Sequence, residues 1–383
     1  MDFFLNGFNT LSHGLIGYII PFLFVLTIVV FFHELGHFLV ARWAGVKVLT
    51  FSLGFGPELF GFNDRHGTRW KVSAIPLGGY VKFFGDQSEA STPSSDDLKA
   101  MTAEERKVSF HYKKVGPRAA IVAAGPIANF LLAIVIFAAL FTFYGKPMQS
   151  ARVDTIQADS AAAAAGFQSG DIVTAIDGDP IESFGEMQRI VSIKAGTPLI
   201  FTVKRGDQIV KLTGTPQQRE IKDNFGNAHR IGVMGITRAT VSGDATVNQA
   251  VNPAAALWLG VKETWFVVDR TASYIAGVFT GRENADQVGG PIRIAQISGQ
   301  VATIGLAALI HLAAVLSVSI GLLNLFPVPL LDGGHLLFYA IEAIRGKPLS
   351  ERSQEYGFRV GLALVLMLMI FATYNDILHL AAS

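Results

Sequence analysis

The sequence predicts a multi-pass α-helical membrane protein with about four transmembrane helices, membrane-associated β-hairpins and an inserted α+β domain. Of its 383 residues, 50% are hydrophobic and 16% are charged, whereas soluble globular domains usually carry ~25% charged residues. The apolar residues gather in four long runs that polar segments separate. Lysine and arginine are also distributed unevenly between those segments.

The four apolar runs are long enough to cross a bilayer. A spanning helix needs ~20 mainly apolar residues, which the first three runs supply without a charge, while the fourth needs its amphipathic continuation. Buried core helices are the alternative, but uncharged runs of this length favour a membrane. No basic region precedes the first run, so we expect a span there and not a cleaved signal peptide. The runs occupy residues 14–32, 119–143, 301–331 and 360–375.

Lysine and arginine indicate the orientation, because they accumulate in short loops on the cytoplasmic side. Residues 42–118 hold twelve of them and residues 332–359 hold four, whereas none lies before Arg42 or after Arg359. We therefore expect both of these segments in the cytoplasm and both termini on the opposite side. The segment 144–300 holds fifteen, but long domains translocate regardless of charge, so we expect it on the side of the termini.

The composition excludes several classes of protein. The chain has no cysteine, which excludes a disulfide scaffold, a thiolate zinc site and a cysteine nucleophile. The formal net charge of +1 gives no indication of a basic surface, so we expect no nucleic-acid partner. The high hydrophobic content excludes intrinsic disorder.

Residues 46–84 are predicted to form short β-hairpins. They contain VKVLTFSLGFG and RWKVSAIPLGGYVKFFG, which are rich in strand-forming residues and interrupted by glycine and proline. Several large apolar side chains crowd this segment, so either a hairpin that re-enters the membrane or an ordinary surface hairpin fits the pattern.

Residues 145–220 have the order of elements expected of a compact α+β domain. A small-residue helix, a Gly-Asp turn, a strand, a second helix and a final hairpin follow one another, and this order resembles a circularly permuted bacterial PDZ domain. PDZ domains take extended peptides onto a sheet edge, which implies peptide C-termini as partners. Residues 254–280 predict an amphipathic helix at the membrane interface, with a fifth span as the alternative.

The motif that carries chemistry lies inside the first run. His33-Glu34-Leu35-Gly36-His37 is an HExxH motif, and positions i and i+4 of a helix share one face, so both imidazoles can bind one Zn²⁺. Glu34 lies one residue further round, where it can act as a base toward a metal-bound water. Ionisable groups in a span are costly and are usually functional. The alternative is a pair of histidines that only make hydrogen bonds in a polar bundle interior.

Catalytic zinc usually has three protein ligands, so a third must come from another part of the chain. Few ionisable residues lie in or next to the other runs: His311, Asp332, His335 and Asp376. Asp332 follows two prolines that interrupt a helix, which is tolerated where the chain lines a polar cavity. The first and third runs enter the membrane from the same side, so His37 and Asp332 both lie toward the cytoplasmic ends of their spans. A carboxylate at Asp332 could therefore meet the two histidines at the same depth.

These two motifs resemble those of a known family. HELGH together with NLFPVPLLDGGH resembles the site-2 protease family of intramembrane zinc metalloproteases, whose patterns are HExxH and Asn-x-x-Pro-x-Pro-x-Leu-Asp-Gly. The PDZ-like insertion, the Gly-Phe-Gly-Pro stretch and the four spans are similar to the bacterial RseP group. Some members of that group carry two PDZ domains, whereas this sequence shows one.

The resemblance implies a role for each residue of the motifs. His33, His37 and Asp332 would be the zinc ligands, and Glu34 the general base.

Two asparagines are implied as substrate-binding residues. Asn324 begins the second motif and would contact the substrate or its oxyanion, with a helix cap as the alternative. Asn129 ends Gly-Pro-Ile-Ala-Asn in the second run, which looks like the GxxxN element of the family. Its implied role is to face the substrate, with helix packing as the alternative.

The implied activity is hydrolysis of peptide bonds within or near the transmembrane segments of single-pass membrane proteins, as in regulated intramembrane proteolysis. Anti-sigma factors or signal-peptide remnants would be the substrates. The implied location is the bacterial inner membrane, with the termini and the PDZ-like domain on the periplasmic side. Two alternatives from other classes are a metal-ion transporter and a catalytically inactive PDZ membrane scaffold.

The predicted organisation therefore has eight parts. They are a first transmembrane helix at 1–44, a cytoplasmic β-hairpin region and linker at 45–116, a second transmembrane helix at 117–144, the PDZ-like domain at 145–220, a connecting region with the amphipathic helix at 221–300, a third transmembrane helix at 301–331, a cytoplasmic loop at 332–358 and a fourth transmembrane helix at 359–381.

Overall fold

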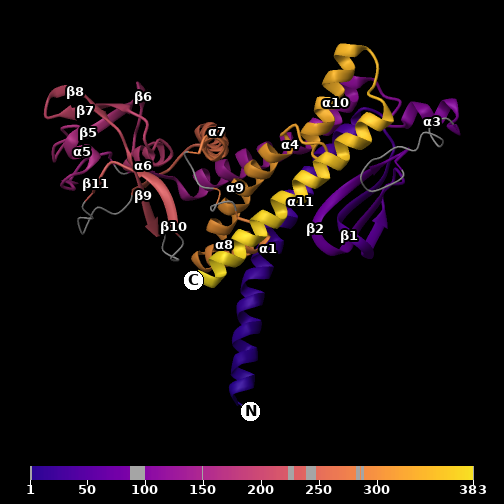
Figure 1. The fold of residues 1–383 in the computed structure, drawn as a ribbon, viewed down its shortest axis with the longest axis horizontal. Helices are drawn as coiled ribbons and strands as arrows, with labels where there is room; N and C mark the ends of the chain where they lie inside the picture. The colour runs from indigo at the N-terminus through magenta and orange to yellow at the C-terminus, as the bar shows by residue number, and fades with distance from the viewer. Residues whose placement is uncertain are drawn as a thin grey trace. The chain divides into compact units, whose positions relative to one another are not determined.

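The chain folds into two compact units, each of which is described by itself (Figure 1). The computed structural model describes residues 2–86, 100–148, 150–222, 228–238, 247–281, 285 and 289–382. The first unit comprises Met1–Ala138, Leu257–Val268 and Val288–Ser383, and the second comprises Ala139–Ala256 and Asp269–Gln287.

Helices make up most of the first unit. The most extensive packing between helices joins α1 to α8 and to α9, and α8 to α9. The described helices of this unit are α1 (Asp2–Trp43), α3 (Ala103–Val108), α4 (Val115–Tyr144), α7 (Pro253–Phe279), α8 (Pro291–Ile304), α9 (Leu306–Asn324), α10 (Asp332–Arg345) and α11 (Glu351–Ala382). Both α4 and α7 continue into the second unit.

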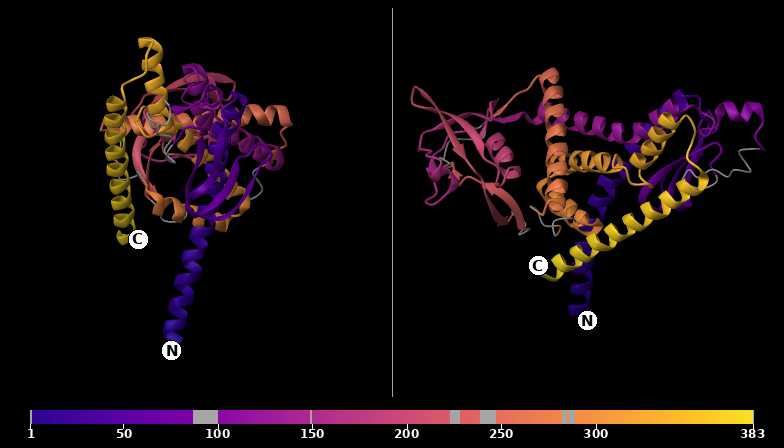
Figure 2. Two further views of the ribbon diagram at one scale, coloured as in Figure 1. Left: turned by 90° about the vertical axis from the view of Figure 1, so that its right-hand side faces the viewer. Right: turned by 45° about the horizontal axis from the view of Figure 1, so that its top comes forward.

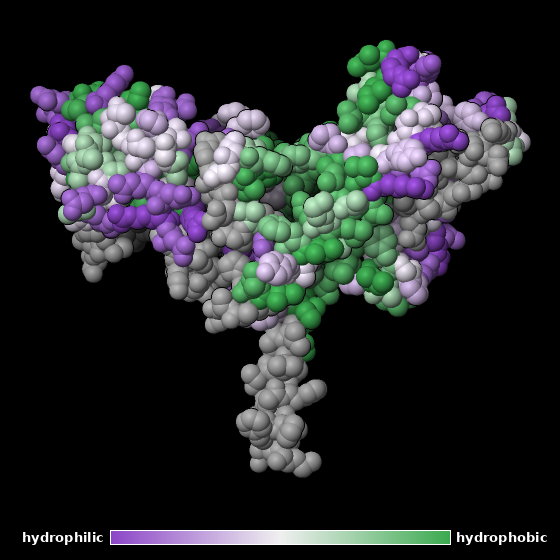
Figure 3. Space-filling view, in the orientation of Figure 1, coloured by the Kyte–Doolittle hydropathy of each residue, from purple (hydrophilic) through white to green (hydrophobic). Residues whose placement is uncertain are grey.

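Among the described residues, four helices are long and apolar enough to cross a membrane. They are Ile16–Trp43, Val115–Tyr144, Leu306–Asn324 and Arg352–Leu378, which agrees with the four predicted runs. Hydrophobic residues cover a large part of the visible surface of this unit (Figure 3), including α11, where Leu366, Met367 and Leu368 are 43–63% exposed. Such a surface is unusual for a soluble protein and typical of one that contacts other apolar material.

The boundaries of the third and fourth candidate spans differ from the prediction. Gly305 has a φ of 135° and separates α8 from α9, so the apolar run 301–331 contains a break that hydropathy does not reveal. α9 ends at Asn324, and two prolines follow that cannot donate the backbone bonds of a continued helix. α11 already begins at Glu351, so the predicted loop 332–358 consists mainly of α10 and the first turns of α11.

The predicted hairpin region forms one antiparallel pair of long, bent strands beside α1 (Figure 2). They are β1 (Val48–Asn63) and β2 (Arg69–Phe83). Phe51 is opposite both Val81 and Trp70. Each strand therefore folds back, and the first half of β1 pairs with the end of β2 on one side and with its beginning on the other. Gly54 (φ 85°) and Gly78 (φ 110°) supply the left-handed backbone for the bends.

One consequence of this register is an open sheet edge. Residues 79–83 of β2 pair with the first half of β1 on one side only, among the described residues. The sheet is attached to the helices by an apolar cluster in which Phe51, 1% exposed, stacks on Trp70 with ring centroids 4.2 Å apart. The edge is therefore held at a fixed place beside α1.

The second unit contains a four-stranded antiparallel sheet in the order β6-β5-β7-β8. Its strands are β5 (Ile172–Ile176), β6 (Asp179–Pro180), β7 (Leu199–Arg205) and β8 (Gln208–Gly214), and its helices are α5 (Ala161–Ala164) and α6 (Phe184–Ile193). The described residues of this unit also form three two-stranded pairs: β3 (Lys146–Met148) with β12 (Val247–Gln249), β4 (Thr155–Ile156) with β11 (Ile236–Thr237), and β9 (Gln217–Lys222) with β10 (Ala228–Val233).

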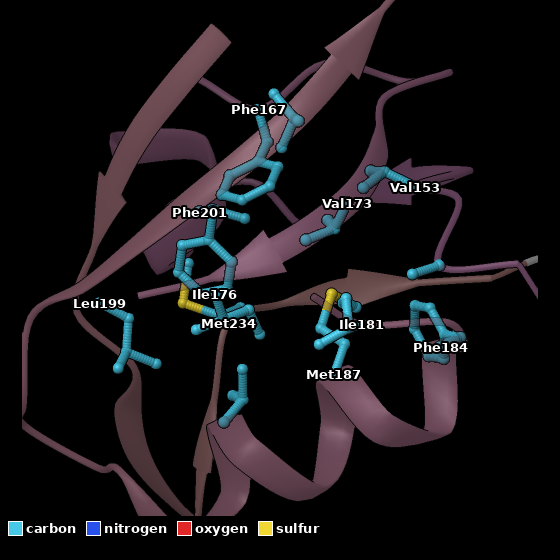
Figure 4. Packing of buried hydrophobic residues seen from close by; sticks show 14 of the residues in the cluster. Val153, Phe167, Val173, Ile176, Ile181, Phe184, Met187, Leu199, Phe201 and Met234 are labelled. Atoms are coloured by element: carbon cyan, nitrogen blue, oxygen red, sulfur yellow. The ribbon is translucent and has the colours of Figure 1, made fainter. Parts of the chain in front are cut away.

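The core of the second unit lies between this sheet and α6 (Figure 4). Leu199, Phe201 and Val203 alternate along β7 and are at most 1% exposed, which is the period-two pattern of a half-buried strand. Met234 belongs to the same cluster, so the compact unit continues past residue 220, the predicted end of the domain. The observed strands and helices otherwise follow the predicted order.

An ion pair joins a buried carboxylate to a partly exposed arginine in this unit. Asp171, 1% exposed, accepts hydrogen bonds from Arg205 Nε and Nη2, each at 2.8 Å, and from the Gln168 N–H at 2.9 Å. Burial alone would raise the pKa of Asp171, but Arg205 and the Gln168 N–H outweigh burial and hold this pKa below its ordinary value.

We predict that Asp171→Asn weakens the second unit at neutral pH and not at low pH. A carboxylate whose pKa is lower in the folded state stabilises folding above its unfolded pKa of ~3.9, and this contribution is lost as the pH falls through the folded value. Hydrogen exchange in β5 and β7, corrected for the intrinsic rate, should be roughly tenfold faster in the variant at pH 7. The difference should shrink below about pH 4. Equal protection of both proteins at pH 7 would contradict this role of Asp171.

Candidate metal centre

The HExxH motif lies on α1 where that helix packs directly against α4. His33 and His37 are one turn apart, with ring centroids 4.8 Å apart at an interplanar angle of 84°, and their Nε2 atoms lie 3.2 Å from each other. The two helices approach closely because Gly36 faces α4 and Gly125 faces α1. A Cβ atom at Gly125 would collide with His37 Nε2, and one at Gly36 would collide with the Ala124 carbonyl oxygen.

The loop after α9 brings Asp332 to these histidines. Asp332 is the first residue of α10, and its Oδ2 lies 3.1 Å from His33 Nε2 and 3.6 Å from His37 Nε2. The turn that places it requires glycine at the next two positions. A Cβ atom at Gly333 or Gly334 would collide with backbone carbonyls of residues 325–328.

The three facing atoms fit a zinc ion. A tetrahedral ion with ligands at 2.0–2.1 Å separates its ligand atoms by about 3.3 Å, and the observed separations are 3.1, 3.2 and 3.6 Å. Asp332 Oδ2 is buried and accepts no hydrogen bond of acceptable geometry within the described part of the chain, which leaves it free for a cation. His33, His37 and Asp332 therefore form a group that could hold a metal ion.

The other nitrogen of each imidazole also has a neighbour. His37 Nδ1 donates to the Ile121 carbonyl oxygen at 2.8 Å, and His33 Nδ1 lies 3.2 Å from the side-chain amide of Asn129. Such contacts fix the ring orientation of metal-binding histidines. Asn129 is 0% exposed and lies against His33, and it is not among the residues that line the cavity described next.

A cavity of about 270 Å³ opens beside this group. Glu34 and Asn324 share it with His33, and the amide nitrogen of Asn324 lies 3.4 Å from His33 Nε2. Its wall comprises His33, Glu34, His37, Gly79, Tyr80, Val81, Phe83, Phe110, Ile121, Val122, Asn324, Leu330, Leu331, Asp332, His335 and Tyr339. The structure thus brings together all the predicted site residues except Asn129, which contacts the cavity only through His33.

Three titratable residues of the cavity wall lie outside the candidate spans: Asp332, His335 and Tyr339. Burial alone would raise the pKa of Asp332, but His37 and His33 outweigh burial and hold this pKa below its ordinary value. Burial lowers the pKa of His335 and raises the pKa of Tyr339 to about 12. At neutral pH these three residues of the wall are thus an ionised Asp332 carboxylate, a neutral His335 imidazole and a neutral Tyr339 phenol.

Of the other ionisable residues that the sequence offered, His335 lines the cavity, whereas Asp376 and His311 lie elsewhere. Asp376 accepts hydrogen bonds from the backbone N–H groups of Gly290, Ile292 and Arg293 and so caps α8. The His311 ring packs on Phe137 with centroids 5.3 Å apart.

Sequence reasoning did not link the Ile121 carbonyl oxygen to the site, because Ile121 belongs to none of the motifs.

Comparison with known proteins identifies the family. Residues 21–368 match the model of peptidase family M50. "Putative zinc metalloprotease Atu1380" of Agrobacterium fabrum is 54% identical over 97% of this chain and 99% of its own length. "Metalloprotease MmpA" of Caulobacter vibrioides is 39% identical over 95% of this chain and 96% of its own length.

A solved structure is similar to a smaller part of the chain. The PDZ domain of an SdrC-like protein from Listeria monocytogenes is 26% identical, covers 22% of this chain and 83% of that chain, and has a TM-score of 0.18. The match to the whole-chain family confirms the predicted resemblance and the expected zinc cofactor. The chain belongs to peptidase family M50, the site-2 protease family, and is a zinc metalloprotease.

Proposed function

We propose that this protein cleaves single-pass membrane proteins within or near their transmembrane segments. The observation that carries the proposal is the convergence of His33, His37 and Asp332 at 3.1–3.6 Å, with two of the three on a helix apolar enough to span a membrane. Ionisable groups at such a place are costly unless they bind one another or an ion.

In this proposal His33, His37 and Asp332 hold the zinc ion and Glu34 is the general base. When bound, zinc polarises the scissile carbonyl and lowers the pKa of a bound water to ~7. Glu34 takes a proton from the attacking water and returns it to the leaving amine. Asn324, in the cavity wall beside His33, binds the substrate or its developing oxyanion.

The substrate must reach the cavity in an extended form. A transmembrane helix satisfies its own backbone groups, so its carbonyls are not open to attack until it unwinds. Residues 79–83 of β2 form an open sheet edge, and Gly79, Tyr80, Val81 and Phe83 line the cavity. An unwound segment that pairs with this edge gains backbone hydrogen bonds next to Glu34.

The proposed setting is regulated intramembrane proteolysis in the bacterial inner membrane, with anti-sigma factors or signal-peptide remnants as substrates. The termini and the PDZ-like residues 145–220 would lie on the periplasmic side. There the PDZ-like part either binds peptide C-termini or excludes substrates with bulky ectodomains. Deletion of residues 150–238, which include the sheet, its helices and the strands that pair with them, separates the two roles, because lost cleavage indicates recruitment and unregulated cleavage indicates exclusion.

Glu34→Gln should abolish proteolysis and leave the metal in place. The amide keeps the size of the side chain but cannot accept the proton, which should lower cleavage of a model single-span substrate by 10²–10⁴-fold. Zinc content measured on the same preparation should equal that of the wild type. Retained cleavage would contradict the base assignment, and lost zinc would mean that Glu34 holds the metal.

Gly125→Ala should weaken zinc binding, because the added methyl group collides with His37 Nε2 and crowds the His33 ring. Gly116→Ala on the same helix is the matched control, since nothing lies within 4 Å of a Cβ atom there. Zinc content after dialysis should fall in the first variant and stay at the wild-type level in the second. Full zinc occupancy in Gly125→Ala would show that the two histidines do not bind the metal in the observed arrangement.

Val81→Pro should reduce cleavage by interrupting the edge strand at the cavity, because proline removes a backbone donor. Arg65→Pro is the control, since Arg65 is exposed and follows Asp64 in a turn that the Gly67 N–H closes on the Asp64 carbonyl at 3.1 Å, a position that tolerates proline. Initial rates should fall at least tenfold only in the first variant. Equal rates in both variants would remove the edge from the mechanism.

A further inference from the structure

Asn129 is a buried amide whose contacts the proposed function leaves unexplained. It lies in the middle of α4, is 0% exposed, and places its side-chain amide nitrogen 3.2 Å from His33 Nδ1. Its amide oxygen is buried and has no hydrogen-bond partner among the described residues. An unpaired amide oxygen in an apolar interior costs free energy, so this contact calls for a physical reason.

The proposed zinc binding by His33 and His37 gives a physical reason for the contact between Asn129 and His33. Each must present the lone pair of Nε2, and a neutral imidazole that does so carries its proton on Nδ1. His37 Nδ1 has an acceptor in the Ile121 carbonyl oxygen at 2.8 Å. His33 Nδ1 needs an acceptor as well, and the side chain within reach in the described structure is that of Asn129.

We infer that Asn129 is a positioning residue whose amide oxygen accepts the Nδ1 proton of His33 and holds its Nε2 toward the metal. A half-turn of the amide exchanges its oxygen and nitrogen. That orientation gives the His33 Nδ1 proton an acceptor and the amide oxygen a donor, and it turns the amide nitrogen to the position that the oxygen occupies in the observed orientation. The inference rests on the proposed function, because it assumes His33 as a ligand.

The backbone of Asn129 is anchored so that its side chain can serve in this way. Ser317 Oγ of α9 donates to the Asn129 carbonyl oxygen at 2.9 Å. A Cβ atom at Gly321 would lie 3.1 Å from Asn129 Cβ, so α9 packs closely on this turn of α4. Contacts with α9 thus fix the backbone of Asn129 while its side chain contacts His33.

Zinc affinity of the purified protein tests the inference. Asn129→Leu keeps the approximate volume and removes the acceptor, so competition with a chelator should show zinc bound 10–100-fold more weakly. Asn129→Asp restores an acceptor in the same place and should recover most of the affinity. Ser298→Ala, which removes a buried hydroxyl bonded within α8, should bind zinc as tightly as the wild type.

Two outcomes would overturn the inference. Wild-type affinity in Asn129→Leu would show that the amide does not support His33, and equal losses in the Leu and Asp variants would show that it acts by packing alone. His33→Ala separates this failure from failure of the proposed function. If His33→Ala also keeps the wild-type zinc affinity, His33 is not a ligand and the metal site itself is wrong.

Discussion

The structure depends on one electrostatic constraint, which is that ionisable groups inside an apolar helix bundle must satisfy one another. His33 and His37 face Asp332 at 3.1 and 3.6 Å, and a zinc ion between them would neutralise the carboxylate. Removing one partner from such a buried set leaves an uncompensated charge or dipole, which is strongly unfavourable. In the proposed function this group would therefore be both the catalytic metal site and a link between α1 and the start of α10.

Small residues let the backbones come close enough for this tie. Gly125 makes room for two imidazoles, and Gly36 lets α1 touch the backbone of α4. Gly333 and Gly334 permit the turn that brings Asp332 into place. Because close packing in membrane proteins depends on such residues more than on apolar area, the glycines of the motifs have as clear a physical role as the histidines.

The sequence predicted the parts of the fold and site that depend on periodicity and hydropathy. Helical spacing placed His33 and His37 on one face. The expected positions of His37 and Asp332 toward the cytoplasmic ends of their spans placed the carboxylate at the same depth in the membrane. The break at Gly305 was not predictable, because glycine is compatible with an apolar span and only its φ of 135° reveals the end of a helix. The family pattern assigned Asn129 to the substrate, but a pattern does not show which neighbour a buried amide contacts.

X-ray absorption at the zinc edge of the purified protein tests the central claim most directly. The account predicts one zinc ion per chain, a first shell of nitrogen and oxygen at 2.0–2.1 Å, and outer-shell scattering from two imidazole rings. Replacing Asp332 with Ala should change the first shell and leave both imidazole signals. A zinc ion without imidazole scattering, or a protein that binds no zinc, would contradict the account.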